Sequence, residues 1–226
     1  MITAGTVSAP PAIGDFERFV RENTRLLAPP LVPEIRLHLA EESLPIWQKT
    51  EEELGELNVP PPFWAFAWAG GQALARYILD NRALAERQHV LDLGSGSGLA
   101  GIAAAKSGAR SVLAADVDPF SIASIRLNAA VNAAEIATTS DDLLATDDGT
   151  WNLVLIADLF YERALAERVM RFARASAERG AAVLVGDPRR SYFPRDAFVE
   201  VAEYKVPVTQ ELEDAELKRT SVWRLP

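Results

Sequence analysis

From residue 70 onward, short apolar runs alternate with segments whose apolar residues recur at helical spacing. The apolar runs predict strands over residues 89–93, 111–115, 137–140, 151–157, 181–186, 198–208 and 220–225. The helical periods lie at residues 70–79, 99–106, 118–131 and 164–178. This alternation predicts an α/β fold with a doubly wound, mainly parallel seven-stranded sheet and helices on both faces. Because no long crossover separates the last two strands, we expect that pair to be antiparallel.

The pattern before residue 63 is different. A helical period from residue 16 to residue 27 ends at Pro29 and Pro30, and residues 35–39 alternate as a half-buried strand would. An acidic segment, residues 41–56, follows before a run of prolines. We therefore predict two parts. Residues 1–62 would form a helical and extended appendage with an acidic helix, packed on a core of residues 63–226.

Glycines at alternate positions follow the first strand of the core. Gly94, Gly96 and Gly98 lie between this strand and the next helix, where glycine permits a sharp turn and close approach of a ligand. The helix start supplies unpaired N–H groups. The next strand ends at Asp116, whose carboxylate can accept hydrogen bonds from ribose hydroxyls. The spacing predicts a site for an adenosine-containing ligand.

Two ligands fit this loop. Residues 96–101 match the GxGxxG dinucleotide motif, which leaves an NAD-dependent dehydrogenase as an alternative. Asp92, however, lies in the strand just before the glycines, where it would repel a pyrophosphate and attract a cationic amino group. S-adenosylmethionine carries adenosine, a methionine zwitterion and no phosphate, so we favour it as the cofactor.

The strand over residues 151–157 delivers Asp158 to the carboxyl edge of the sheet, where doubly wound folds hold their ligands. A carboxylate at this edge suits a basic amine as the substrate. The alternative is that Asp158 only caps a helix. Arg189 and Arg190 follow the last parallel strand, where they would contact an acidic partner or lie in a solvated loop.

Composition excludes several classes of protein. The 226 residues include no Cys and two His, which excludes disulfide scaffolds, thiolate metal sites and His-rich metal centres, and we expect no metal. A net charge of −9 argues against nucleic-acid binding. The chain lacks both a long apolar run and a basic leader, so we expect a cytoplasmic protein with no membrane contact.

Several segments resemble one enzyme family. Residues 92–98, DLGSGSG, resemble the first motif of class I S-adenosylmethionine-dependent methyltransferases. Asp158-x-x-Tyr161 resembles the D-x-x-Y signature of the seven-stranded lysine methyltransferases of the methyltransferase-like group. Residues 63–74, 185–189 and 220–223 are similar to the branch that methylates the β-subunit of electron transfer flavoprotein. Without the presequence of mitochondrial members, the chain looks like a bacterial member.

The resemblance implies a protein-lysine N-methyltransferase that acts, as an expected monomer, on the electron transfer flavoprotein β-subunit or, alternatively, on a ribosomal protein. It places Asp158 and Tyr161 as catalytic residues facing the target lysine, with Trp64 and Phe160 beside them. The cofactor residues that it implies are Trp68, Asp92, Gly94, Ser95, Gly96, Gly98, Asp116 and Asp141 or Asp142.

Two opposing effects act on the charge of the target lysine. Lysine has a pKa of about 10.4 in solution, whereas methyl transfer requires a neutral amine. Asp158 alone would raise the lysine pKa. Desolvation between Trp64, Phe160 and Tyr161, together with the nearby sulfonium, would lower it.

Overall fold

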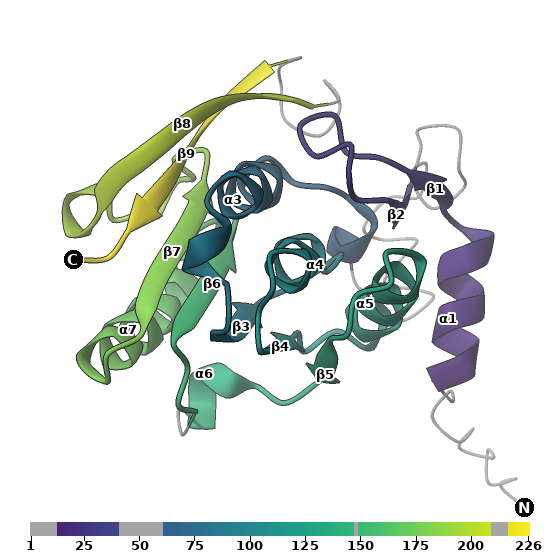
Figure 1. Cartoon of the computed structure of the whole chain (residues 1–226), viewed down its shortest axis with the longest axis horizontal. Coiled ribbons are helices and arrows are strands. Elements are labelled where there is room, and N and C mark those ends of the chain that lie inside the picture. Colours follow the sequence, from purple (N-terminus) through teal and green to yellow (C-terminus); the bar gives the residue numbers. More distant parts are fainter. Residues whose placement is uncertain (1–12, 41–60, 147–148, 209–216) are drawn as a thin grey trace, which may run out of the picture.

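The computed structural model describes residues 13–40, 61–146, 149–208 and 217–226. Its main feature is a seven-stranded sheet with the strand order β5-β4-β3-β6-β7-β9-β8 (Figure 1). The strands are β3 (His89–Leu93), β4 (Ser111–Ala115), β5 (Ala137–Thr139), β6 (Leu153–Ala157), β7 (Ala182–Asp187), β8 (Val199–Pro207) and β9 (Leu217–Arg224). The first five are parallel, and β9 is antiparallel to both β7 and β8. The predicted fold class is therefore confirmed.

Helices cover both faces of this sheet (Figure 1). On one face lie α3 (Ala69–Asp80), α4 (Leu99–Lys106) and α5 (Pro119–Val131). On the other face lie α6 (Leu143–Thr146) and α7 (Arg163–Glu178). Short 3-10 turns, η1 (Phe63–Ala65), η2 (Arg82–Leu84) and η3 (Arg195–Ala197), join these elements.

The central strand β6 shows why the sheet needs helices on both sides. Its residues alternate between the two faces, so that Leu153 and Leu155 pack under α3 and α4. Val154 and Ile156 pack against α7 on the other face. A strand that is apolar at every position is stable only when both faces are covered. The continuous apolar run in the sequence reflects that requirement.

Parallel pairing brings the ends of the central strands to one edge. β3 pairs with β4 on one side and with β6 on the other, and the chain continues in opposite directions from β3. Ligands of doubly wound sheets bind where the strand order reverses, outside the carboxyl ends of the strands. The glycine loop after β3, Asp116 after β4 and Asp158 after β6 therefore all lie at this edge.

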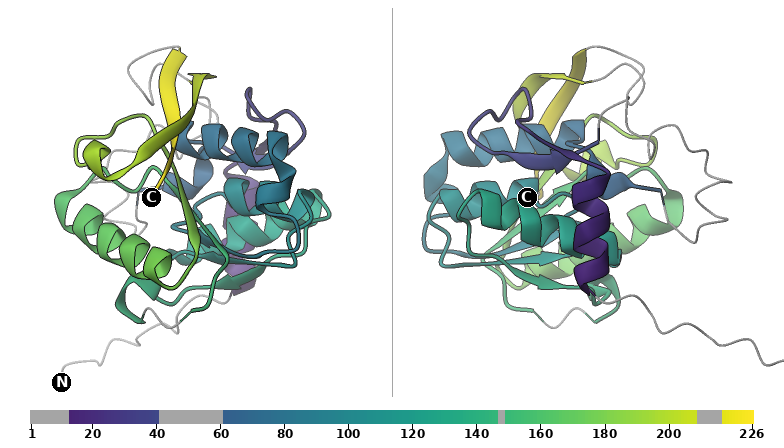
Figure 2. Two further views of the ribbon diagram at one scale, coloured as in Figure 1. Left: turned by 60° about the vertical axis from the view of Figure 1, so that its left-hand side comes forward. Right: turned by 90° about the vertical axis from the view of Figure 1, so that its right-hand side faces the viewer.

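The described N-terminal residues pack on α5 and add Val32, Ile35, Leu37 and Leu39 to the hydrophobic core that α3 and α4 share. They include α1 (Ile13–Glu22) and a two-stranded antiparallel sheet of β1 (Arg25–Leu27) and β2 (Leu37–Leu39). Figure 2 shows α1 lying beside α5, with the Phe16 and Phe120 ring centroids 4.8 Å apart. Of the described residues before 63, none joins the seven-stranded sheet.

Two expectations for this region need correction. The helix predicted over residues 16–27 ends at Glu22. The side chains of Asn23 and Thr24 donate hydrogen bonds to the Phe19 and Val20 carbonyls in its last turn, so the helix does not continue. The strand predicted over residues 35–39 is limited to β2 and pairs only with β1. The predicted acidic helix within residues 41–56 lies outside the described residues. Within the described ranges, no helix is long and apolar enough to cross a membrane.

Candidate active site

The loop between β3 and α4 has the backbone conformation that its glycines predict. Gly94, Gly96 and Gly98 have φ angles of 63°, 53° and 83°, in the left-handed region that side chains disfavour. A Cβ atom on Gly94 would lie 2.6 Å from a methyl carbon of Leu159, so this turn is also tightly packed. For Gly96, the described residues place one atom within 4 Å of such a Cβ, the Phe63 carbonyl oxygen at 4.0 Å. Among these residues, Gly96 is therefore less tightly packed than Gly94.

Asp92 holds the loop in shape. One of its carboxylate oxygens accepts hydrogen bonds from the Ser95 hydroxyl at 2.6 Å and from the Gly101 backbone N–H at 2.8 Å. The carboxyl is buried, and this burial raises its pKa to about 6. Asp92 thus connects β3 to the first turn of α4, and Ser95 directs its hydroxyl inward to Asp92.

Asp116 joins the ends of two neighbouring strands. Its carboxylate accepts the Gly96 backbone N–H at 2.8 Å and the Asp118 backbone N–H at 3.0 Å. Burial raises its pKa. Asp118 in turn caps α5 by accepting the Phe120 N–H at 2.9 Å. The predicted ribose-binding acid is therefore fixed beside the glycine loop.

The structure separates the two adjacent acids after β5. Asp142 accepts the Leu144 N–H at 3.2 Å at the start of α6, and Arg168 of α7 donates to it at 2.5 Å. Asp141 is exposed and accepts a hydrogen bond from the Thr139 hydroxyl at 2.8 Å. Asp142 thus has a local structural role, whereas Asp141 lies exposed at the carboxyl edge.

The Asp158 carboxylate accepts hydrogen bonds from distant parts of the chain. One oxygen accepts the Gly71 backbone N–H at 2.9 Å, in the first turn of α3. The other accepts both Nε and Nη2 of Arg190, at 2.9 and 2.5 Å. Trp68, the N-cap residue of α3, makes no side-chain capping bond, so Asp158 supplies the negative charge that this helix terminus favours. Asp158 thus accepts a hydrogen bond at the start of a helix far away in sequence, although it is the N-cap residue of neither α3 nor α7.

This arrangement depends on a close backbone approach. A Cβ atom on Gly70 would lie 2.2 Å from the Gly186 carbonyl oxygen and 2.5 Å from the Asp158 carboxylate. Only glycine lets α3 pack this closely on β7 and place its N–H groups at Asp158. Asp158 itself has a φ of 60°, an uncommon conformation for a non-glycine residue that is enriched for Asp and Asn.

A second buried acid, Asp187, lies next to this pair at the end of β7. It accepts the Arg190 backbone N–H at 2.7 Å, and its other oxygen is buried with no hydrogen-bond partner among the described residues. Burial, and secondarily the charge of Asp158, raises its pKa to about 7. We assigned no role to Asp187 from the sequence, although its place directly after a parallel strand is a signal that could have identified it.

Aromatic side chains form a partly exposed wall beside Asp158. Tyr161 is 45% exposed, and Phe63 is 48% exposed. Their ring centroids lie 5.7 Å apart. Trp68 continues this wall, with its ring 6.0 Å from Phe63, its Nε1 donating to the Phe63 carbonyl, and the Arg190 guanidinium carbon 5.5 Å from its ring centroid.

Two aromatic residues expected beside the target lysine are located elsewhere. Trp64 is fully buried and stacks on Phe120 in the cluster that joins α1 to α5. Phe160 is also fully buried, with its ring 5.2 Å from that of Phe193. Neither side chain is exposed to a ligand in this structure. Phe63, which we had not assigned to the site, occupies the exposed position.

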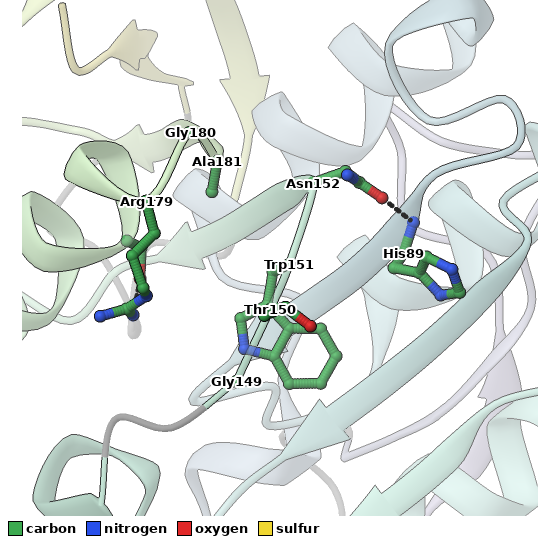
Figure 3. Close-up of a pocket in the computed structure, with 9 residues that line it drawn as sticks. His89, Gly149, Thr150, Trp151, Asn152, Arg179, Gly180 and Ala181 are labelled. Atoms are coloured by element: carbon green, nitrogen blue, oxygen red, sulfur yellow. Dashed lines mark hydrogen bonds between the residues drawn. The ribbon is translucent and has the colours of Figure 1, made fainter.

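A cavity also lies at the opposite edge of the sheet, near the amino ends of β3, β6 and β7. Figure 3 shows His89, Trp151, Asn152 and Arg179 around it, with the His89 N–H bonded to the Asn152 side chain at 3.0 Å. It is remote from the glycine loop and Asp158. Over the described ranges, no group of His, Cys, Asp and Glu residues could hold a metal ion.

Comparisons with known proteins agree with the resemblance seen in the sequence. Residues 72–186 match the family model described as ribosomal protein L11 methyltransferase (PrmA). The ribosomal protein L11 methyltransferase of Geobacillus kaustophilus (strain HTA426) is 38% identical over 102 residues, which cover 45% of this chain and 29% of that protein. Among solved structures, magnesium protoporphyrin IX methyltransferase (ChlM) from Synechocystis PCC 6803 with bound S-adenosylmethionine shares the fold. The two structures superpose with a TM-score of 0.51 at 14% sequence identity, and the match covers 70% of this chain and 80% of that chain.

Other relatives match almost the whole chain. The electron transfer flavoprotein beta subunit lysine methyltransferase of Danio rerio is 34% identical over 225 residues, covering 96% of this chain and 86% of that protein. The Homo sapiens protein of the same name is 33% identical over 216 residues, covering 92% and 81%. The chain therefore belongs to the family of electron transfer flavoprotein β-subunit lysine methyltransferases, and it shares its central domain with the ribosomal protein L11 methyltransferases.

Proposed function

We propose that this protein transfers methyl groups from S-adenosylmethionine to lysine side chains of the electron transfer flavoprotein β-subunit. The observation that carries the proposal is the placement of Asp158 and Tyr161 at the same sheet edge as the glycine loop and Asp116. A cofactor at the loop and an amine at Asp158 would thus be neighbours. Family membership over most of the chain supports the lysine substrate.

Several groups would hold the cofactor. The loop at Gly96 would receive it, Asp116 would accept the ribose hydroxyls, and the Trp68 ring would lie against it. Asp141, which is exposed, would meet the adenine amino group in preference to Asp142, which is held by Arg168. The cofactor supplies a methyl group already activated on a sulfonium, so the protein needs no metal or covalent nucleophile for this chemistry.

The substrate side consists of Asp158, Tyr161 and Phe63. Asp158 would accept a hydrogen bond from the target amine and orient its lone pair. The exposed rings of Tyr161 and Phe63 would contact the aliphatic stem of the lysine and exclude water around it. Trp64 and Phe160, which are fully buried, would not contact the lysine. A net charge of −9 would favour approach of a locally basic protein surface.

The substrate is tested by incubating the enzyme with methyl-labelled S-adenosylmethionine and two purified proteins in parallel, electron transfer flavoprotein and ribosomal protein L11. The L11 arm is included because residues 72–186 match that family model. We expect label in the flavoprotein β-subunit, lost when the labelled lysine is replaced by arginine. Label in L11 alone would contradict the proposed substrate, and label in neither would contradict the proposed function.

The cofactor is tested separately by calorimetry with S-adenosylhomocysteine and with NAD. We expect binding of S-adenosylhomocysteine and no heat with NAD, because Asp92 and Asp116 would repel a pyrophosphate at this loop. Binding of NAD alone would support the dehydrogenase alternative.

A further inference from the structure

The Asp158 carboxylate is already paired with an arginine of the same chain. Arg190 donates two hydrogen bonds to one Asp158 oxygen, and the pair is largely buried, with side-chain exposures of 18% for Arg190 and 10% for Asp158. Such a pair interacts strongly because little water screens it. An arginine stays protonated at all accessible pH values, so the pair keeps its balanced charge.

This pairing changes what Asp158 does to a neighbouring amine. An isolated carboxylate stabilises an ammonium ion and raises its pKa, which keeps the lone pair of the target nitrogen occupied by a proton. With the Arg190 guanidinium bonded to it, Asp158 retains oxygen lone pairs for a hydrogen bond but exerts a weaker net field on the amine than an isolated carboxylate would. The guanidinium also repels an approaching ammonium. Both effects favour the neutral amine.

The surroundings hold Arg190 in this position. Its backbone N–H donates to Asp187 at 2.7 Å, and its guanidinium lies over the Trp68 ring. Among the described residues, Asp187 at the end of β7 lies beside the pair, and Arg190 shares the surroundings of Tyr161 with Glu162 and Asp116. Arg189 turns away, toward Glu200 and Glu203 of β8.

We infer that Arg190 is a positioning residue that acts through Asp158, so that the target lysine binds as a neutral amine. This inference rests on the proposed function. The lysine ammonium gives one proton to solvent on entering the site. The neutral nitrogen then forms a bond to the methyl carbon, the carbon–sulfur bond breaks with its electron pair going to sulfur, and the methylated ammonium leaves with its charge.

The test compares Arg190→Gln with Arg190→Lys and with Arg189→Gln. The last is a matched control, because it removes the same charge one residue away without touching Asp158. The first readout is the number of protons released when electron transfer flavoprotein binds to the enzyme loaded with S-adenosylhomocysteine, measured by calorimetry in buffers of different ionisation enthalpy. The second is the pH midpoint of kcat.

We expect the wild-type enzyme and Arg189→Gln to release close to one proton per bound lysine at pH 8. Arg190→Gln should release fewer protons per bound lysine. It should also move the pH midpoint of kcat upward by about 1–3 units, which is the size of effect that one adjacent charge has on a pKa. Arg190→Lys keeps the positive charge and should keep the wild-type midpoint. Calorimetry with S-adenosylhomocysteine alone verifies that each variant is folded.

Two results would overturn the inference while leaving the proposed function intact. One is an Arg190→Gln enzyme with the wild-type proton release and pH midpoint, whatever its rate. The other is tighter substrate binding by Arg190→Gln with an unchanged midpoint, which would make Arg190 a competitor of the lysine. If Arg190→Gln does not fold, Arg190→Lys takes its place in the test, and a shift in the pH midpoint of its kcat would overturn the inference. A wild-type enzyme that methylates no protein contradicts the proposed function itself.

Discussion

The close approach of α3 to β7 makes Gly70 a position of the site that tolerates no side chain. In Gly70→Ala, the new methyl group would lie 2.2 Å from the Gly186 carbonyl oxygen and 2.5 Å from Asp158, so α3 must move. Overpacking of this kind costs about 1–3 kcal/mol. Moving the helix also breaks the charge-assisted bond from Gly71 to Asp158, which contributes about 1.5–3 kcal/mol. We expect the free energy of unfolding to fall by at least about 2 kcal/mol.

The neighbouring glycine is a matched control. A Cβ atom on Gly71 would make only ordinary contacts, at 4.0 Å from Ala157 and Leu99. In Gly71→Ala the backbone N–H still reaches Asp158, and alanine is favoured over glycine in a helix by up to about 1 kcal/mol. Urea unfolding of both variants, with kcat measured alongside, distinguishes them. A Gly70→Ala enzyme as stable and as active as Gly71→Ala would refute this reading of the site.

Three further predictions concern the acids of the carboxyl edge. Asp116→Ala should weaken S-adenosylhomocysteine binding at least about tenfold in calorimetry, because a charged hydrogen-bond acceptor is worth about 1.5–3 kcal/mol; an unchanged Kd would contradict the ribose assignment. Asp141→Ala should weaken the same binding more than Asp142→Ala, and the reverse order would exchange their roles. The raised pKa of Asp187, about 7, means that folding binds a proton between about pH 4 and pH 7, so stability is lost as pH rises through that window. Asp187→Asn should therefore be more stable than the wild type at pH 8 by about 1–3 kcal/mol, with the difference vanishing near pH 4; an equal gain at both pH values in chemical unfolding would count against it.

The fold was predictable because its strongest signals are local. β6 is buried on both faces, so its residues form a continuous apolar run, and each helix that covers it has apolar residues at helical spacing. Both patterns can be read directly from the sequence. Short elements were less predictable. Asn23 and Thr24 end α1 through their side-chain hydrogen bonds, and β1 pairs only with β2, so neither boundary follows from periodicity.

The acids at the strand ends were predictable for the same reason as the fold. Asp92, Asp116 and Asp158 each follow or lie within an apolar strand, and strand ends meet at one edge of a parallel sheet. Their partners could not be found in this way. Arg190 meets Asp158 only after β6 and β7 have paired, and the contact of Gly71 with Asp158 spans most of the core.

The aromatic wall shows a further limit of sequence reasoning. Phe63 and Trp64 are adjacent and similar in chemistry, yet Phe63 is exposed beside Tyr161 and Trp64 is buried against Phe120. The difference arises because η1 turns one ring outward and the other toward α1 and α5. A single turn of 3-10 helix, which has no hydrophobic period to detect, thus decides which ring is exposed beside Tyr161.

We propose that methyl transfer occurs at Asp158, at the edge shared with the glycine loop. Single-turnover transfer from S-adenosylmethionine to electron transfer flavoprotein, measured for the wild type and Asp158→Asn, tests it most directly. Asparagine keeps the shape of the side chain and can still accept the Gly71 N–H. We expect the variant to bind S-adenosylhomocysteine with unchanged affinity and to transfer methyl groups at least about a hundredfold more slowly, because the amine is no longer oriented. Transfer at the wild-type rate, with cofactor affinity retained, would contradict the account.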